Sequence, residues 1–186
     1  MEFSTNPTLA KHLDEQDQLS SFRGKFVIKD PDTIYLDGNS LGRLPIDTMS
    51  HLQDAIERQW GERLIRVWNE GWNDTPKTLG DKIAQLIGAL PGEVVVTDST
   101  SANLFKLAVA ALQARPKRLK ILSDVLNFPS DLYIFQGIID FLGGGHLLEL
   151  IPSHDDIHIQ PENVAAAIDE QTALVSLTHV AFKSAF

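Results

Sequence analysis

The fold is decided by residues 94–106, which read VVVTDSTSANLFK. A β-branched run predicts a strand over Val94–Thr97, and the apolar periodic segment after it predicts a helix over Ala102–Leu112. Thr100 and Ser101 lie in the hydroxyl-rich turn between the two. The free N–H groups and positive end of a helix, together with such hydroxyls, can bind a phosphate. An ordinary helix N-cap is the commoner reason for a cluster of this kind.

From residue 93 onward, segments with strand character alternate with segments of helical character. Further strands are predicted at Lys120–Ser123, His146–Ile151 and Ala173–Val180, and helices at Ser130–Leu142 and Pro161–Ile168. This alternation is typical of βαβ units, in which parallel strands form a sheet with helices on its faces. Ligands bind such sheets outside the carboxyl ends of the strands, so the residues that follow each strand are the candidates for a site.

The first 92 residues are predicted to be mainly helical. Apolar residues recur there at three- and four-residue steps, which is typical of amphipathic helices. The pattern predicts helices at Thr8–Phe22, Ile46–Trp68 and Thr78–Leu90, and short extended segments at Phe26–Ile28 and Ile34–Leu36. The second extended segment leads into residues 37–45, where two glycines and a proline indicate a turn-rich loop.

The composition is that of an ordinary globular protein, since 43% of the 186 residues are hydrophobic and 22% are charged. A net charge of −9 argues against a general nucleic-acid or anionic-membrane binder. The absence of cysteine excludes disulfides, thiolate metal sites and cysteine nucleophiles. No apolar run approaches the roughly 20 residues of a membrane span, and the polar residues 1–7 show no signal peptide. We therefore expect a soluble cytoplasmic protein.

A second candidate site follows the strand predicted at Lys120–Ser123. Pro129 biases Phe128 away from helical geometry, so Phe128 is expected in an extended turn. Ser130 is then placed to cap the next helix, with Asp131 in its first turn. An aromatic ring and a carboxylate at the carboxyl end of a strand could stack on and polarise a flat ring. An ordinary capped turn with a half-buried phenylalanine is the alternative.

The segment His154–His158 has the composition of a metal site but not the geometry. Pro152 and the alternation of Ile157 with Ile159 favour an extended chain. Residues i and i+4 of a strand lie about 13 Å apart, which is too far for both histidines to bind one ion. We therefore expect no metal. The sequence contains neither a Gly-x-Gly-x-x-Gly motif nor a Walker loop, so neither a dinucleotide fold nor a P-loop is supported.

Taken together, four motifs resemble those of kynureninases. They are YLDGNSLG at residues 35–42, WNEGW at 68–72, DSTSANLFK at 98–106 and NFPSD at 127–131. Their order and spacing agree along nearly the whole chain. The resemblance implies the α/β fold of pyridoxal-phosphate enzymes related to aspartate aminotransferase (fold type I). Residues 1–92 would form a helical segment with a substrate-side loop, and residues 93–186 an incomplete cofactor-binding large domain with part of a mostly parallel sheet.

The resemblance also implies a function and a set of site residues. Kynureninases are homodimers that hydrolyse L-kynurenine or 3-hydroxykynurenine to alanine and an anthranilate, in tryptophan catabolism and NAD biosynthesis. Pyridoxal 5'-phosphate does the chemistry. The positions that match cofactor contacts of the family are Thr100, Ser101, Phe128, Pro129, Ser130, Asp131 and Thr178. Asn39 and Ser40 fall in a loop that we expect near the substrate of the partner subunit.

No catalytic residue of the family can be assigned to this chain. The Schiff-base lysine of kynureninases lies beyond its end, and neither Lys106 nor Lys183 stands at that position. We therefore expect the N-terminal part of a longer enzyme, inactive alone. Two alternatives stay open. One is another enzyme of the same fold, such as an aminotransferase or a cysteine desulfurase. The other is a non-catalytic chain that binds a partner through an unpaired sheet edge.

Overall fold

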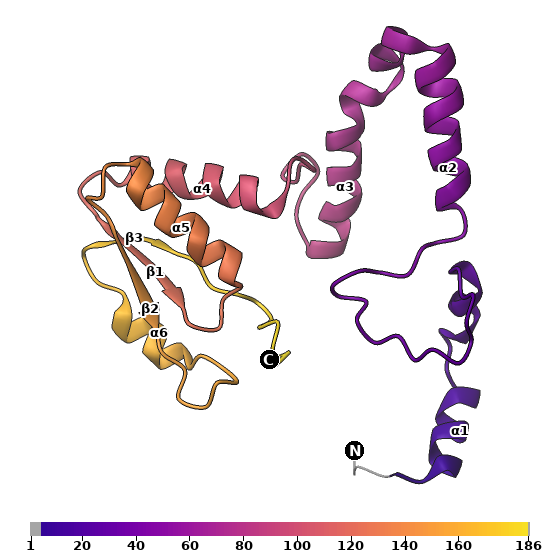
Figure 1. Ribbon diagram of the computed structural model, residues 1–186, viewed down its shortest axis with the longest axis horizontal. Coiled ribbons are helices and arrows are strands. Elements are labelled where there is room, and N and C mark those ends of the chain that lie inside the picture. The colour runs from indigo at the N-terminus through magenta and orange to yellow at the C-terminus, as the bar shows by residue number, and fades with distance from the viewer. Residues whose placement is uncertain (1–4, 186) are drawn as a thin grey trace. The chain divides into compact units, whose positions relative to one another are not determined.

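The computed structural model describes residues 5–185 (Figure 1). The first four residues, where no signal peptide is expected, lie outside the described part. Contacts divide the chain into two compact units, one up to Thr78 and one from Leu79 onward. The second unit therefore begins earlier than the predicted domain boundary at 92/93. Gly80 shows why, because its Cα lies against the backbone of Val94. The assignment of 1–92 and 93–186 to separate domains stays a prediction.

The first unit is mostly helical, as the sequence predicts. Its elements are α1 (Pro7–Glu15), a 3-10 helix (Ser20–Lys25), α2 (Thr48–Asp54), a π-helical segment (Ala55–Glu62), 3-10 helices at Leu64–Glu70 and Trp72–Asp74, and the start of α3 (Thr75–Ile87). Asn6 caps α1, since its side chain accepts a hydrogen bond from the backbone N–H of Thr8 at 2.9 Å. Pro7 occupies the first helical position, where its missing N–H is not needed.

Two of the predicted helices are shorter than expected. The helix predicted at Thr8–Phe22 ends at Glu15, because the Asp17 side chain accepts from the backbone N–H of Leu19 at 2.8 Å and closes a turn. The helix predicted at Ile46–Trp68 is α only as far as Asp54. It widens into a π-helical segment and then stops at Leu64, whose φ of 53° no α-helix can include.

The strand predicted at Val94–Thr97 is wrong, and the two segments predicted to be extended do not form strands either. Phe26–Ile28 forms no strand but only an isolated antiparallel bridge between Phe26 and Pro45. Within the described residues, Ile34–Leu36 and Val94–Thr97 belong to no strand. A strand exists only where a neighbour supplies its hydrogen bonds, and β-branched composition alone does not supply that neighbour.

The second unit contains the predicted parallel sheet. In the described chain its strands are β1 (Lys120–Asp124), β2 (Leu147–Ile151) and β3 (Thr172–Val175), in the order β2-β1-β3. Both pairings are parallel. The helices of this unit are α4 (Thr100–Ala114), α5 (Pro129–Phe141) and α6 (Pro161–Ala167). The α/β fold class is thus confirmed, with β3 shorter than predicted.

The core of the second unit lies where α4 and α5 pack on the sheet (Figure 1). Every residue of β1 is buried, as expected for the central strand of a parallel sheet. The buried apolar cluster is made of Ala108, Leu112, Ile121, Phe135 and Ile138. This packing fixes the turn that joins β1 to α5.

At the amino end of β1, a charged cluster links β1 and β2 to the turn that precedes β3. Lys120 is only 4% exposed. Its Nζ lies 2.9 Å from the Asp169 carboxylate and 3.1 Å from that of Glu149, and donates to the carbonyl of Ala167 at 2.8 Å. The hydrogen bond with Asp169 is the main reason that the pKa of Lys120 is raised, and it lowers the pKa of Asp169. The cluster lies at the end of the sheet opposite to the residues that follow the strands.

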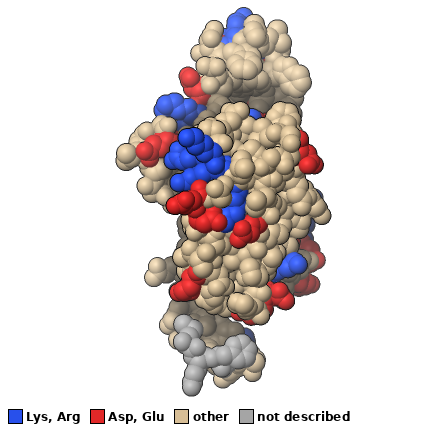
Figure 2. All heavy atoms as spheres, turned by 90° about the vertical axis from the view of Figure 1, so that its left-hand side faces the viewer, with Lys and Arg blue, Asp and Glu red and all other residues tan. Residues whose placement is uncertain are grey.

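On the surface, charges of both signs are mixed. On the face shown in Figure 2, a group of Lys and Arg side chains lies directly beside Asp and Glu. In the part of the chain that the structure describes, no helix has the length and apolar character required to cross a membrane.

Candidate functional site

The carboxyl ends of β1 and β3 lie where the strand order reverses, since β2 and β3 are added on opposite sides of β1. The chain passes from β1 to β2 on one side and then returns to β3 on the other side of β1. Open α/β sheets bind ligands in the crevice at such a switch point. A pocket of about 510 Å³ lies there, a volume that suits a small molecule.

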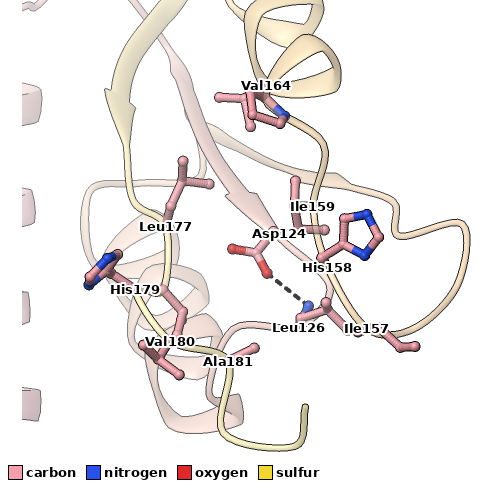
Figure 3. A pocket seen from close by; sticks show the side chains of 12 residues that line it. Asp124, Leu126, Ile157, His158, Ile159, Val164, Leu177, His179, Val180 and Ala181 are labelled. Carbon is pink, nitrogen blue, oxygen red and sulfur yellow. Dashed lines mark hydrogen bonds between the residues drawn. The ribbon is translucent and has the colours of Figure 1, made fainter. Parts of the chain in front are cut away.

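The pocket is mainly apolar and contains one buried carboxylate. Asp124, the last residue of β1, is 3% exposed and lies between Leu177 and Ile159 (Figure 3). One of its carboxylate oxygens accepts from the backbone N–H of Leu126 at 2.9 Å, drawn as the dashed line in Figure 3. Thr178 also lines the pocket, at the end of the segment that continues β3.

Asn127 joins the segments that follow β1 and β3. It is 4% exposed. Its Oδ1 accepts from the backbone N–H of Phe128 at 2.7 Å and from the hydroxyl of Thr178 at 2.6 Å. Its Nδ2 donates to Ser123 Oγ at 3.0 Å. The structure thus brings two predicted cofactor contacts, Phe128 and Thr178, to the same oxygen of one side-chain amide. Asn127 stands in the NFPSD motif, but the motif alone predicts no role for it.

Phe128 has the extended backbone that Pro129 predicts, with φ −63° and ψ 131°. Its ring is 50% exposed and meets Phe182 edge to face, with ring centroids 4.9 Å apart. The prediction that Ser130 caps the helix is wrong. The helix α5 begins at Pro129, with Phe128 in the cap position, so Ser130 lies inside the first turn and its hydroxyl donates to Asp131 at 3.3 Å. Asp131 lies in the first turn of α5, as predicted.

Thr100 and Ser101 are the first two residues of α4, and both are exposed. Ser99, rather than either of them, is the N-cap, since its hydroxyl accepts from the backbone N–H of Ala102 at 3.3 Å. Among the described residues, no hydrogen bond is made by the backbone N–H of Thr100 or Ser101. Nor does any join these two residues to the turn at Phe128–Asp131. The start of α4 therefore keeps donors available for an anion.

Asn39 and Ser40 lie in the first unit, in a loop held by its own contacts. The hydroxyl of Tyr35 donates to the carbonyl of Leu41 at 2.5 Å, which closes the loop. The Ser40 hydroxyl donates to the Asp37 carboxylate at 2.7 Å. Both Asn39 and Ser40 are exposed. Their place near a substrate stays a prediction, because the loop and the pocket belong to different units.

The segment His154–His158 forms a turn stabilised by Asp155. One carboxylate oxygen of Asp155 accepts from the backbone N–H groups of Ile157 and His158 at 3.0 and 3.1 Å. The other lies 2.7 Å from His158 Nδ1. The hydrogen bond from Ile157 is the main reason that the pKa of Asp155 is lowered. Within residues 5–185, no group of three His, Asp or Glu side chains is placed to hold a metal ion.

Comparison with known proteins gives a consistent result. The chain is 46% identical over 179 residues to a kynureninase of Pseudomonas fluorescens and, over the same length, to one of Burkholderia pseudomallei (strain 1106a). It is 45% identical to a kynureninase of Burkholderia mallei (strain SAVP1). Each alignment covers 94% of this chain but only 41% of the relative, so the chain spans well under half the length of these proteins.

The chain was also compared with models of protein families. Residues 34–182 match the family described as Aminotransferase class-V. The match contains the loop at Asn39–Ser40, the start of α4, the turn after β1 and the segment after β3. Because it extends over well more than half of the chain, the chain belongs to the class-V aminotransferase family.

Proposed function

We propose that this chain is part of a kynureninase, an enzyme that hydrolyses L-kynurenine, or 3-hydroxykynurenine, to L-alanine and anthranilate or 3-hydroxyanthranilate. The observation that carries the proposal is the pair Phe128 and Thr178, held side by side by Asn127 at the switch point of the sheet. The similarity to kynureninases along the chain supports the choice of reaction. It favours this enzyme over another member of the same fold.

The residues at the strand ends fit pyridoxal 5'-phosphate. Phe128 presents a half-exposed aromatic face that can stack on a flat ring. Asp131, in the first turn of α5, supplies a carboxylate next to it. Thr100 and Ser101 supply two hydroxyls and unpaired N–H groups at the start of a 15-residue helix, which suits the phosphate. The pocket beside Thr178 has the volume and apolar character that a small flat ligand requires.

In this proposal the chain binds and orients the cofactor, and it contributes no proton-transfer group. The cofactor supplies an electron sink that stabilises negative charge on the substrate. The buried Lys120 is engaged by Asp169 and Glu149 at the other end of the sheet, and Lys106 pairs with Asp98. Neither lysine is therefore offered as the base. We assign that role to a lysine outside this chain, and we expect the chain alone to be inactive.

The first unit supports a further part of the proposal, that the enzyme is a homodimer. Among the described residues up to Thr78, Val67 alone is buried. Large apolar side chains stay open, with Met49 61% exposed and Trp60 65% exposed. A segment with so small a core requires another surface to fold against. A partner subunit would supply that surface and would place Asn39 and Ser40 near its substrate.

The test is an assay on the complete gene product with bound pyridoxal 5'-phosphate. Kynurenine is added, and anthranilate is followed by its fluorescence while alanine is measured in the same sample. We expect both products in equal amounts from the complete product and neither from the 186-residue chain. A complete product that binds the cofactor but leaves kynurenine intact would refute the proposal. A panel of amino-donor and cysteine substrates would then separate an aminotransferase from a desulfurase.

A further inference from the structure

We infer that Asn127 is a positioning residue of the proposed cofactor site, and that it fixes the Thr178 hydroxyl as a hydrogen-bond acceptor for a bound ligand. Neither the family match nor the motifs assign Asn127 a role. The inference rests on the proposed function and deepens it, because it states how the chain orders the cofactor contacts and what kind of ligand group Thr178 accepts. The Asn127 amide is buried, so its oxygen and nitrogen both require hydrogen-bond partners within the protein.

The partners of Asn127 determine which way its amide points. A backbone N–H can only donate, so the atom that faces the Phe128 N–H at 2.7 Å must be the amide oxygen. The amide nitrogen then faces Ser123 Oγ at 3.0 Å, which accepts. Because Asn127 and Ser123 are both buried, a flipped amide would set donor against donor at Phe128. One orientation of the side chain is therefore strongly preferred.

The orientation of the amide decides the orientation of the Thr178 hydroxyl. Thr178 Oγ1 lies 2.6 Å from the amide oxygen, which has no hydrogen to give. The single proton of Thr178 is therefore used in this bond. The hydroxyl oxygen still has lone pairs, and Thr178 lines the pocket. It can thus accept a hydrogen bond from an N–H or O–H group of a bound ligand, and it cannot donate one.

The Asn127–Thr178 bond lies just beyond the last backbone hydrogen bond between β1 and the segment that continues β3. The backbone N–H of Ser176 still donates to the carbonyl of Leu122 at 2.9 Å, and Thr178 comes two residues later. The side-chain bond therefore holds this short extension to the segment after β1, as the backbone hydrogen bonds hold β3 to β1. Its loss should release Thr178 and the Phe128 turn from one another while β1 and β3 stay paired. We accordingly expect a large effect on cofactor binding and a small one on folding.

The experiment uses the complete gene product, freed of cofactor and titrated with pyridoxal 5'-phosphate. Asn127→Ala and Thr178→Val should each weaken the affinity about tenfold, the effect of about 1.4 kcal/mol in a hydrogen-bonded site. The double variant should bind pyridoxal 5'-phosphate at most twofold less tightly than whichever single variant has the lower affinity. Both substitutions remove the same Asn127–Thr178 hydrogen bond, so their effects should not add. The absorption maximum of the bound cofactor should shift in the same direction in all three.

Two matched variants serve as controls. Thr178→Ser keeps the hydroxyl and should bind within twofold of the unchanged protein. Ser123→Ala removes the partner of the amide nitrogen but leaves the Phe128 N–H to hold the amide oxygen, so it should shift the absorption maximum less than Asn127→Ala does. The unfolding midpoint of each cofactor-free variant is measured alongside. If Asn127→Ala fails to fold, the comparison of Thr178→Val with Thr178→Ser decides the question.

The possible results separate this inference from the proposed function. An unchanged protein that takes up no pyridoxal 5'-phosphate refutes both. A protein that binds it, with Asn127→Ala binding equally well, refutes the role of Asn127 alone. Additive losses in the double variant refute the claim that Asn127 acts through Thr178. Equal affinities of Thr178→Val and Thr178→Ser refute the acceptor role of the hydroxyl.

Discussion

Two glycines inside helices are expected to respond in opposite ways to the same substitution. Gly80 lies in α3 and Gly137 in α5. By helix propensity alone, alanine at either position should stabilise the helix by about 0.8–1 kcal/mol. The surroundings of the two positions differ. A Cβ on Gly137 would meet nothing within 4 Å, so Gly137→Ala should raise the free energy of unfolding by nearly that full amount.

At Gly80 the new Cβ would lie 2.0 Å from the carbonyl oxygen of Val94 and 2.7 Å from its carbonyl carbon. An ordinary contact begins near 3.4 Å, so α3 and the segment at Val94 would have to separate by more than an ångström. The obstacle is backbone, which cannot rotate away as a flexible side chain can. Overpacking of this kind costs about 3 kcal/mol at the upper end of its usual range. After the gain in propensity, Gly80→Ala should lower the free energy of unfolding by about 2 kcal/mol.

The assay is urea unfolding of the complete gene product, followed by far-ultraviolet circular dichroism and by hydrogen exchange. Gly80→Ala should unfold at lower urea than the unchanged protein, and the amides of residues 94–99 should exchange faster. Gly137→Ala should unfold at equal or higher urea with no change in that exchange. Equal shifts of the two variants to higher urea would show that helix propensity alone governs both sites. The close packing of α3 on Val94 would then be refuted.

Three further predictions follow from the same structure. Phe135→Ala should cost about 3–5 kcal/mol of stability in urea unfolding because Phe135 is fully buried, whereas Tyr133→Ala, exposed on the same helix, should cost under about 0.5 kcal/mol. Phe128→Leu should weaken pyridoxal 5'-phosphate binding severalfold in a titration, since an apolar side chain without a π face remains. The folded-state pKa of Asp169 is lowered by Lys120, so its stabilisation is present above the unfolded pKa of about 3.9 and is lost as pH falls through the folded value. Acid unfolding curves of Asp169→Asn should lack this loss; curves parallel to those of the unchanged protein would contradict it.

Local signals in the sequence predict the second unit well. The strands at Lys120–Asp124 and Leu147–Ile151 were predicted to within a residue, and the helix after Pro129 likewise. In each case a short apolar segment ends at a turn, and its period identifies the element. The extended backbone of Phe128 is local as well, because the proline ring restricts the residue before it.

The predictions that failed depend on partners far along the chain or on one dihedral angle. Val94–Thr97 has the composition of a strand, but no described strand lies beside it. The helix predicted through Trp68 is interrupted by the positive φ of Leu64. Leucine rarely adopts a positive φ, so the sequence does not predict the interruption. Ser130 was expected to cap α5, yet the helix begins one residue earlier because Pro129 favours the first helical position.

The candidate site shows the same division between local and distant determinants. Phe128 and Thr178 could each be proposed from a motif, but the bond that joins their segments links residues 51 positions apart. No periodicity or spacing in the sequence predicts this hydrogen bond, since it depends on the register of β1 against β3. In the described chain, the start of α4 has no such hydrogen bond to the segments that follow β1 and β3. The ring side of the proposed cofactor site is therefore ordered by hydrogen bonds between the segments that follow β1 and β3, whereas the start of α4 is positioned by the apolar packing of that helix on the sheet.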